Sequence, residues 1–218
     1  MTLAARGIVA GYRRGMRVLD GVDLAVEPGA VVGLAGPSGC GKSTLARVLA
    51  LLHAPWAGEV EIDGARAPGV RYRAPRELRT AVGVVFQNPR LAADPRLPLR
   101  EIVAEPLLAT GRRPDPGWAD ELHTRVGLTA ELLGRRPHEV SDGQLQRACL
   151  ARSLVLRPRY LICDEMTAML DASTTAVLVG VVADQARDGV GVLAVSHDEE
   201  LLAVWADQVE RPFAGAAH

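Results

Sequence analysis

The chain has 218 residues, of which 48% are hydrophobic and 23% are charged, and these are the proportions of a globular protein. Its formal net charge of −1 excludes a general electrostatic attraction to nucleic acid, so we expect no nucleic-acid partner. No apolar run reaches the ~18–20 residues that cross a bilayer, and the first residues lack a signal-peptide pattern. We therefore expect a cytoplasmic protein that meets a membrane only through a partner.

Short strands and one helix are predicted in the first part of the chain. Apolar patterns favour strands at residues 3–12, 17–27, 30–35, 59–63 and 81–86. The spacing of residues 42–52 predicts a helix, with Pro55 and Gly58 beyond its end. Residues 65–80 carry several arginines and two prolines, and we interpret them as solvated surface.

A mainly helical stretch follows over residues 88–139, with breaks expected at Pro114, Pro116, Gly127 and Pro137. A polar turn at residues 141–143 then opens a helix that runs to about residue 156. Further helices are predicted at residues 173–187 and after His197, and apolar strands at 160–163 and 191–196.

The alternation of strands and helices predicts a mainly parallel sheet that helices cover on both faces. We expect one domain over residues 1–218. Its core comprises about residues 1–87 and 158–218, and an inserted helical subdomain lies at about 88–157.

A phosphate-binding loop is predicted where residues 36–43 match the pattern G-x-x-x-x-G-K-[ST] between an apolar strand and a helix. Its glycines let backbone N–H groups turn inward around phosphates, while Lys42 reaches the β- and γ-phosphates and the Ser43 hydroxyl ligates Mg²⁺. Lys42 is the only lysine in the chain, which indicates that a compact ammonium is required there. The nucleotide-binding candidates are Gly36, Ser38, Gly39, Cys40, Gly41, Lys42, Ser43 and Thr44.

Two carboxylates end the apolar strand at residues 160–163. At this position in a phosphate-loop enzyme, Asp164 is expected to hold Mg²⁺ through its water shell and Glu165 to polarise the attacking water as a general base. His197 and Gln87 also follow apolar strands, and Tyr12 lies in the first strand. Taken singly, each of these three is as well explained by capping, packing or exposure.

The motifs together resemble the nucleotide-binding subunits of ATP-binding-cassette (ABC) transporters over essentially the whole chain. The phosphate loop, VVFQNP, VSDGQLQRACLARSL, YLICDE, AMLD and VSHD occur in the family's order and rough spacing. The resemblance implies an α/β fold of the P-loop NTPase (RecA-like) type, with an N-terminal antiparallel β-subdomain and the inserted helical subdomain. It also implies ATP hydrolysis with ATP and Mg²⁺ as cofactors.

The resemblance assigns roles to residues that the motifs alone leave open. Tyr12 would stack on adenine, Gln87 would ligate Mg²⁺ and sense the transmembrane partner, and His197 would contact the γ-phosphate. A signature loop would close over the ATP of an opposite subunit in a head-to-tail dimer. The residues implied at that interface are Ser141, Gly143, Gln144 and Asp171.

The signature departs from the family pattern, because LSGGQ becomes Val-Ser-Asp-Gly-Gln with Asp142 in place of the first glycine. A carboxylate suits the first turn of the following helix. Close to a triphosphate, however, it costs electrostatic energy unless it points away, so the site that this loop completes could be weakened. Met166, where a proline commonly follows the acid pair, is expected to have little effect.

Residues 86–107 resemble the oligopeptide, dipeptide and nickel importer branch of the family. Many members of that branch carry a C-terminal extension, which we expect to be lacking because the sequence ends at His218. The implied partners are transmembrane permease subunits, a solute-binding protein and a second ATPase subunit. That second subunit is either a copy of this chain or, as Asp142 favours, a similar chain. The place implied is the cytoplasmic face of the membrane.

Two other readings stay open. A cassette ATPase that acts on DNA or ribosomes would carry a long coiled coil or a second cassette, and neither pattern is visible. A degenerate regulatory subunit gains support from Asp142, whereas Lys42, Glu165 and His197 oppose it.

Overall fold

A computed structural model describes residues 1–212 except 14, 114 and 169. The predicted break at Pro114, Met169 of the AMLD motif and residues 213–218 at the end of the predicted core lie outside the described residues. No helix in the described part of the chain is long and apolar enough to span a bilayer.

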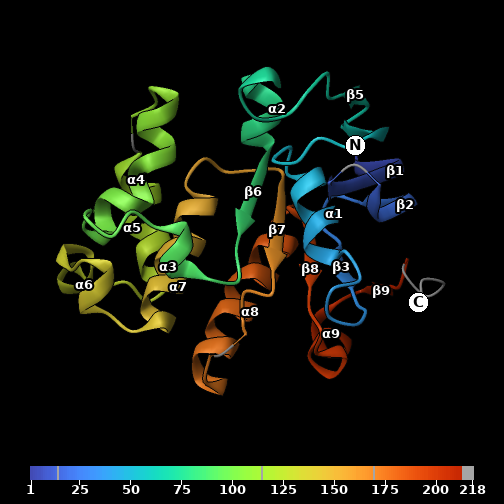
Figure 1. The fold of residues 1–218 in the computed structure, drawn as a ribbon. Coiled ribbons are helices and arrows are strands. Elements are labelled where there is room, and N and C mark those ends of the chain that lie inside the picture. Colours follow the sequence, from blue (N-terminus) through green and yellow to red (C-terminus); the bar gives the residue numbers. More distant parts are fainter. Residues whose placement is uncertain (14, 114, 169, 213–218) are drawn as a thin grey trace.

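A parallel sheet lies at the centre of the molecule (Figure 1), with its strands in the order β6-β7-β8-β3-β9. Every residue of β3, β7 and β8 is buried, as expected when helices or a second sheet cover both faces. The five strands are β3 (Val31–Leu34), β6 (Val82–Val85), β7 (Tyr160–Asp164), β8 (Gly191–Val195) and β9 (Gln208–Glu210).

A second, antiparallel sheet is formed mainly by the N-terminal part of the chain, in the order β2-β1-β4-β5. Buried positions alternate with exposed ones in the second half of β2, and the buried side chains belong to the apolar cluster that also contains residues of α1. The strands are β1 (Leu3–Arg13), β2 (Met16–Val26), β4 (Ala57–Ile62) and β5 (Ala65–Arg66). The predicted fold class, a parallel core with an antiparallel N-terminal sheet, is confirmed.

Helices α3–α7 group on one side of the parallel sheet, and the antiparallel sheet lies on the other (Figure 1). The helices in the described part of the chain are α1 (Lys42–Leu49), α2 (Arg76–Ala81), α3 (Pro89–Ala92), α4 (Leu99–Thr110), α5 (Pro116–Arg125), α6 (Ala130–Gly134), α7 (Asp142–Leu154), α8 (Ala172–Arg187) and α9 (Glu199–Trp205). This part of the chain also contains the 3₁₀ turns η1 (Arg71–Arg73) and η2 (Pro137–Glu139).

Two apolar clusters cover the two faces of the parallel sheet, and β7 divides its side chains between them. Leu161 and Cys163 pack with residues of α4, α7 and α8. Tyr160 and Ile162 pack on the opposite face, with α1 and the antiparallel sheet. Because successive side chains of a strand point to opposite faces of the sheet, β7 packs against α1 on one face and against α7 on the other.

Three details differ from the sequence-based prediction. Helix α1 ends at Leu49, because the chain turns through a left-handed conformation at Leu51 (φ 57°). Residues 65–80 contain β5, η1 and α2, whose side chains are mostly exposed and so give no apolar periodicity. Strand β9 was not predicted, because it is three residues long, lies at the sheet edge and has an exposed residue on either side of the half-buried Val209.

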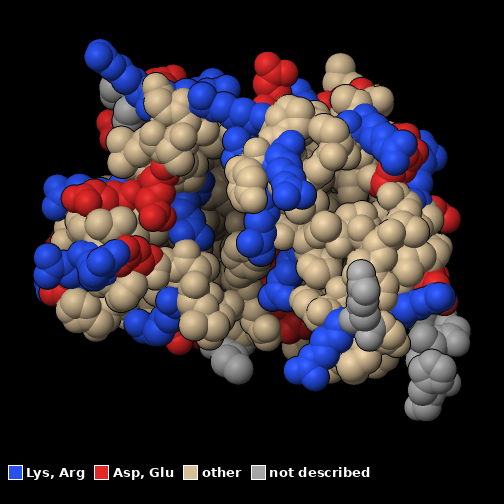
Figure 2. Space-filling model, turned by 45° about the horizontal axis from the view of Figure 1, so that its top comes forward, with Lys and Arg blue, Asp and Glu red and all other residues tan. Residues whose placement is uncertain are grey.

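Charged side chains are spread over the surface. Basic residues, which are all arginine apart from the buried Lys42, are interspersed with acidic residues over much of the face that Figure 2 shows. This distribution accompanies the net charge of −1.

Candidate functional site

The predicted phosphate loop lies between the end of β3 and the start of α1, and its backbone requires glycine at the helix start. Gly41 precedes α1 with φ +112°, and a Cβ there would come within 2.8 Å of Leu19. The loop therefore presents the N-terminus of α1, with its unpaired N–H groups, to the space in front of it.

Lys42 is curled into this loop. Its side chain is only 4% exposed, and Nζ donates to the carbonyl oxygens of Gly36 at 2.7 Å and Pro37 at 2.9 Å. Both partners are neutral carbonyls, so the ammonium brings a full positive charge to the centre of the loop. It can exchange these carbonyls for the oxygens of an anionic group, which bind a cation more strongly.

A cavity of about 430 Å³ opens in front of the loop, which is within the usual range for a small-molecule site. Residues from the antiparallel sheet, the phosphate loop and two strand ends converge on it. Its lining consists of Tyr12, Val18, Ser38, Gly39, Gly41, Lys42, Ser43, Thr44, Gln87 and Glu165.

Ser43 and Asp164 meet at the floor of the site. The Ser43 hydroxyl donates to Asp164 Oδ1 at 2.9 Å. Burial raises the pKa of the Asp164 carboxyl, and the hydrogen bond from Ser43 opposes this shift. Gln87 lines the same cavity. A hydroxyl, a carboxylate and a side-chain amide all offer hard oxygen donors, which suit Mg²⁺.

Three strand ends bring Gln87, Glu165 and His197 together. Gln87 Nε2 donates to Glu165 Oε2 at 2.9 Å, and His197 Nδ1 lies 3.5 Å from Glu165 Oε1. Glu165 has a left-handed backbone (φ 49°), which its N–H bond to Val195 O at 3.0 Å helps to hold. Such a conformation in a side-chain-bearing residue is strained and is typical of functional sites.

Tyr12 stands at the rim of the cavity. Its hydroxyl lies 3.2 Å from Thr44 Oγ1 and accepts a bond from Arg47 Nη1 at 3.0 Å. Its ring centre is 5.1 Å from that of His53, and 57% of the residue is exposed. An aromatic face is therefore available to a planar group at the cavity mouth.

The signature residues form a separate group that does not line this cavity. Ser141 caps α7: its Oγ accepts from Gln144 N at 3.2 Å, and Gln144 Oε1 accepts from Ser141 N at 3.0 Å. Gly143 packs closely on α8, because a Cβ there would lie 3.0 Å from the Thr174 side chain. Asp142 pairs with Arg90 at 2.6 Å.

Asp171 caps α8 directly beside this group. Its carboxylate accepts bonds from Thr174 N at 2.9 Å, Thr174 Oγ1 at 2.8 Å and Ser173 Oγ at 2.5 Å. These bonds stabilise the ionised form and lower the pKa of the Asp171 carboxyl. Through Thr174, Asp171 and Gly143 belong to one packed unit.

Gln146 was not singled out from the sequence, yet it joins the two groups. It is 1% exposed on α7, and its Nε2 donates to Phe86 O and to Met166 O, both at 3.0 Å. These carbonyls belong to the neighbours of Gln87 and Glu165. A polar side chain on the otherwise apolar face of a predicted helix is the signal that could have identified it.

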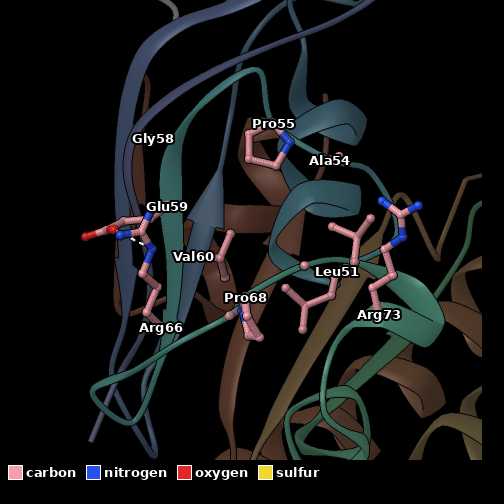
Figure 3. Close-up of a pocket in the computed structure, with 12 residues that line it drawn as sticks. Leu51, Ala54, Pro55, Gly58, Glu59, Val60, Arg66, Pro68 and Arg73 are labelled. Atoms are coloured by element: carbon pink, nitrogen blue, oxygen red, sulfur yellow. Dashed lines mark ion pairs between the residues drawn. The ribbon is translucent and has the colours of Figure 1, made fainter.

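A second cavity, of about 260 Å³, lies between β4, β5 and the end of α1 (Figure 3). It contains the ion pair between Arg66 and Glu59, at 2.9 Å. Its lining includes none of the predicted nucleotide-binding, catalytic or interface residues, and no role is assigned to it.

A strand, a phosphate loop, a helix and a carboxylate at the end of β7, another strand of the same parallel sheet, together define a P-loop nucleotide-binding domain. Residues 19–168 match the family model described as ABC transporter. The chain belongs to the ABC transporter family, and the predicted resemblance is confirmed.

Curated relatives place the chain near peptide transport proteins. It is 37% identical over 209 residues to the di/tripeptide transport ATP-binding protein DppF of Pseudomonas aeruginosa. It is 36% identical over 220 residues to the oligopeptide transport ATP-binding protein OppD of Mycobacterium tuberculosis. The alignments cover 94% and 97% of this chain but only 64% and 35% of those relatives, so the chain spans less than two thirds of their length.

Solved structures show the same fold. The dimeric structure of MJ0796, a bacterial ABC transporter cassette, superposes with a TM-score of 0.84 at 28% identity, covering 97% of this chain and 94% of that chain. A post-hydrolysis dimer of the same cassette, bound to ADP and Pi, gives a TM-score of 0.85 at 28% identity with the same coverage.

Proposed function

We propose that this chain is the ATP-hydrolysing subunit of an ABC importer and that it works in a head-to-tail dimer. The observation that carries the proposal is the division of the site residues. Gln87, Glu165 and His197 converge beside the phosphate loop, whereas the signature group lies outside the cavity lining. The first group is suited to the chain's own nucleotide, and the second group is left to complete the site of a partner.

In this proposal the cavity residues divide the chemistry among them. Lys42 releases the carbonyls of Gly36 and Pro37 and binds phosphate oxygens. Ser43 and Asp164, together with Gln87, hold Mg²⁺, which neutralises charge on the transferred phosphoryl group. Tyr12 stacks on adenine at the cavity mouth.

Glu165 is the proposed general base. Its carboxylate takes up the proton of the attacking water while Gln87 and His197 hold its two oxygens in place. His197 contacts the γ-phosphate in the closed state. Positioning of this kind accounts for most of the catalysis in phosphoryl transfer.

The partners follow from the relatives, which are named as peptide transport ATP-binding proteins. We assign to this chain two permease subunits, a second ATPase subunit and a solute-binding protein, with a peptide or a nickel-like solute as cargo. The protein is placed peripherally on the cytoplasmic face of the membrane, and residues 88–157 form its inserted helical subdomain. The regulatory reading is less favoured, because Lys42, Asp164 and Glu165 are all in place around the cavity.

Replacing Glu165 by Gln tests the proposal. Removing the base while keeping the side-chain shape is expected to lower ATP turnover by about 10²–10⁴-fold. ATP binding is expected to persist, and an ATP-dependent dimer is expected to accumulate. Turnover, nucleotide binding and sedimentation are measured in parallel on Glu200→Gln, an exposed glutamate of α9. Unchanged turnover in Glu165→Gln would remove that residue from the mechanism.

A further inference from the structure

The guanidinium of Arg90 binds three acceptors around the signature loop. Arg90 lies in α3, three residues after Gln87. Its Nη1 donates to Pro137 O at 2.8 Å, and its Nη2 donates to Val140 O at 3.2 Å. The same Nη2 lies 2.6 Å from Asp142 Oδ1. Arg90 thus holds the residue before Ser141 and the residue after it.

The backbone that carries Arg90 is itself fixed to the cavity. Asn88 caps α3, and its Oδ1 accepts bonds from Arg90 N at 3.0 Å and Leu91 N at 3.2 Å. Asn88 directly follows Gln87, whose side chain bonds Glu165. The signature loop is therefore attached through Arg90 to the segment that contributes Gln87 to the nucleotide cavity.

Arg90 also offsets the repulsion expected between the Asp142 carboxylate and a triphosphate. Asp142 is the first residue of α7 and replaces a glycine of the usual signature. The helix N-terminus favours its negative charge, but an approaching triphosphate does not. The guanidinium, directly paired with this carboxylate, offsets that repulsion.

We propose that Arg90 is a positioning residue of the ATPase reaction. It fixes the signature loop and neutralises Asp142, so that the loop can close over the nucleotide bound by the second subunit. This inference rests on the proposed function, in which the signature loop acts in trans. The side chains of Arg90 and Asp142 are 45% and 58% exposed. An exposed ion pair contributes little to folding stability. Removing this pair is therefore expected to lower ATP turnover and to leave the melting temperature unchanged.

The test compares Arg90→Ala with Arg135→Ala in the transporter complex purified through a tag on this chain. Arg135 is a matched control, because its side chain is 48% exposed and pairs with Glu131 at 2.8 Å on α6. We expect Arg90→Ala to lower kcat for Mg-ATP by about tenfold, the size of a typical coupling between neighbouring groups. Binding of ATP to the isolated chain, through its own phosphate loop, is expected to be unchanged.

Two further variants separate charge from shape. Arg90→Ala combined with Asp142→Gly removes the unpaired carboxylate and is expected to recover most of the lost kcat. Arg90→Lys restores the charge without the planar fork and is expected to recover part of it. Raising ionic strength from about 0.05 to about 0.5 M is expected to narrow the gap between Arg90→Ala and the control, because exposed charges are screened.

The inference is overturned if Arg90→Ala matches Arg135→Ala, or if the double variant is as slow as Arg90→Ala. A lowered melting temperature together with lost ATP binding in Arg90→Ala and Arg90→Lys would also overturn it, since Arg90 would then be structural. Failure of the wild-type chain to bind ATP would instead reject the proposed function. The two failures are therefore distinguishable.

Discussion

The phosphate-loop cavity and the signature group are built in opposite ways. In the cavity, side chains from distant segments point inward, and Lys42 is almost fully buried with only neutral carbonyls as partners. In the signature group, the capping side chains bond near neighbours in the sequence: Ser141 with Gln144, and Asp171 with Thr174. Asp142 differs, because its partner Arg90 is distant in the sequence. The cavity can therefore bind an anion through Lys42. The signature group, in contrast, is already held in place by hydrogen bonds within its own loop and helix ends.

Substitutions in the two regions are therefore expected to change different measured quantities. A change in the cavity acts on nucleotide binding by a single chain. A change in the signature group leaves that binding intact and acts only when a second subunit is present. Three substitutions test the comparison, beginning with the largest expected effect.

Lys42→Met is expected to have the largest effect. Methionine keeps the length of the side chain but removes the charge that phosphate oxygens would bind. We expect the isolated chain to lose ATP affinity by about 10²-fold or more, equal to ~3 kcal/mol. Titration with a fluorescent ATP analogue measures the loss, and a melting curve controls for folding. Unchanged ATP affinity would contradict the conclusion that the cavity binds nucleotide through Lys42.

Gln146→Leu is expected to affect both regions, because this side chain connects α7 with Phe86 and Met166. Leaving these two carbonyls without their donor is expected to cost about 2 kcal/mol of unfolding free energy. Turnover should fall further than the lost stability explains, since Gln87 and Glu165 adjoin the released carbonyls. Gln185→Leu is the matched control, because Gln185 is also a buried glutamine but lies in α8. Equal turnover in both variants would contradict a role for Gln146 at the site.

Ser141→Ala has the smallest expected effect on the isolated chain. Removing the cap of α7 is expected to lower the free energy of unfolding by about 1 kcal/mol. Thr129→Ala removes the comparable cap of α6 and should cost a similar amount. Only Ser141→Ala is expected to reduce turnover of the assembled dimer, while ATP binding by the single chain is retained in both. Chemical denaturation and ATPase assays measure the two effects. Weakened ATP binding in the single chain would show that the two regions are not separable.

The sequence predicted the parts of the site that follow from chain direction. Gln87, Glu165 and His197 each lie within two residues of the end of an apolar strand, and the carboxyl ends of parallel strands share one edge of the sheet. The proximity of these three residues can therefore be predicted without knowing how the side chains pack. The phosphate loop was equally predictable, because its pattern is local and only glycine suits the backbone at Gly41.

The remaining features depend on contacts between distant residues. Arg90 and Asp142 are 52 positions apart, and nothing in either residue alone predicts the pair. Gln146 shows only that a polar side chain lies on an apolar helix face, and its acceptors cannot be predicted because they are backbone carbonyls, which every residue carries. Strand β9 was missed because its pairing with β3, and not its three residues, decides its conformation.

The solitary lysine has a practical consequence. Apart from the chain's first amino group, Lys42 is the sole primary amine that an acylating reagent can find in this protein. Its Nζ is engaged with two carbonyls inside the loop, so modification requires that the loop loosen. Mass spectrometry of the acylated product therefore follows opening and occupancy of one loop directly, without any engineered label.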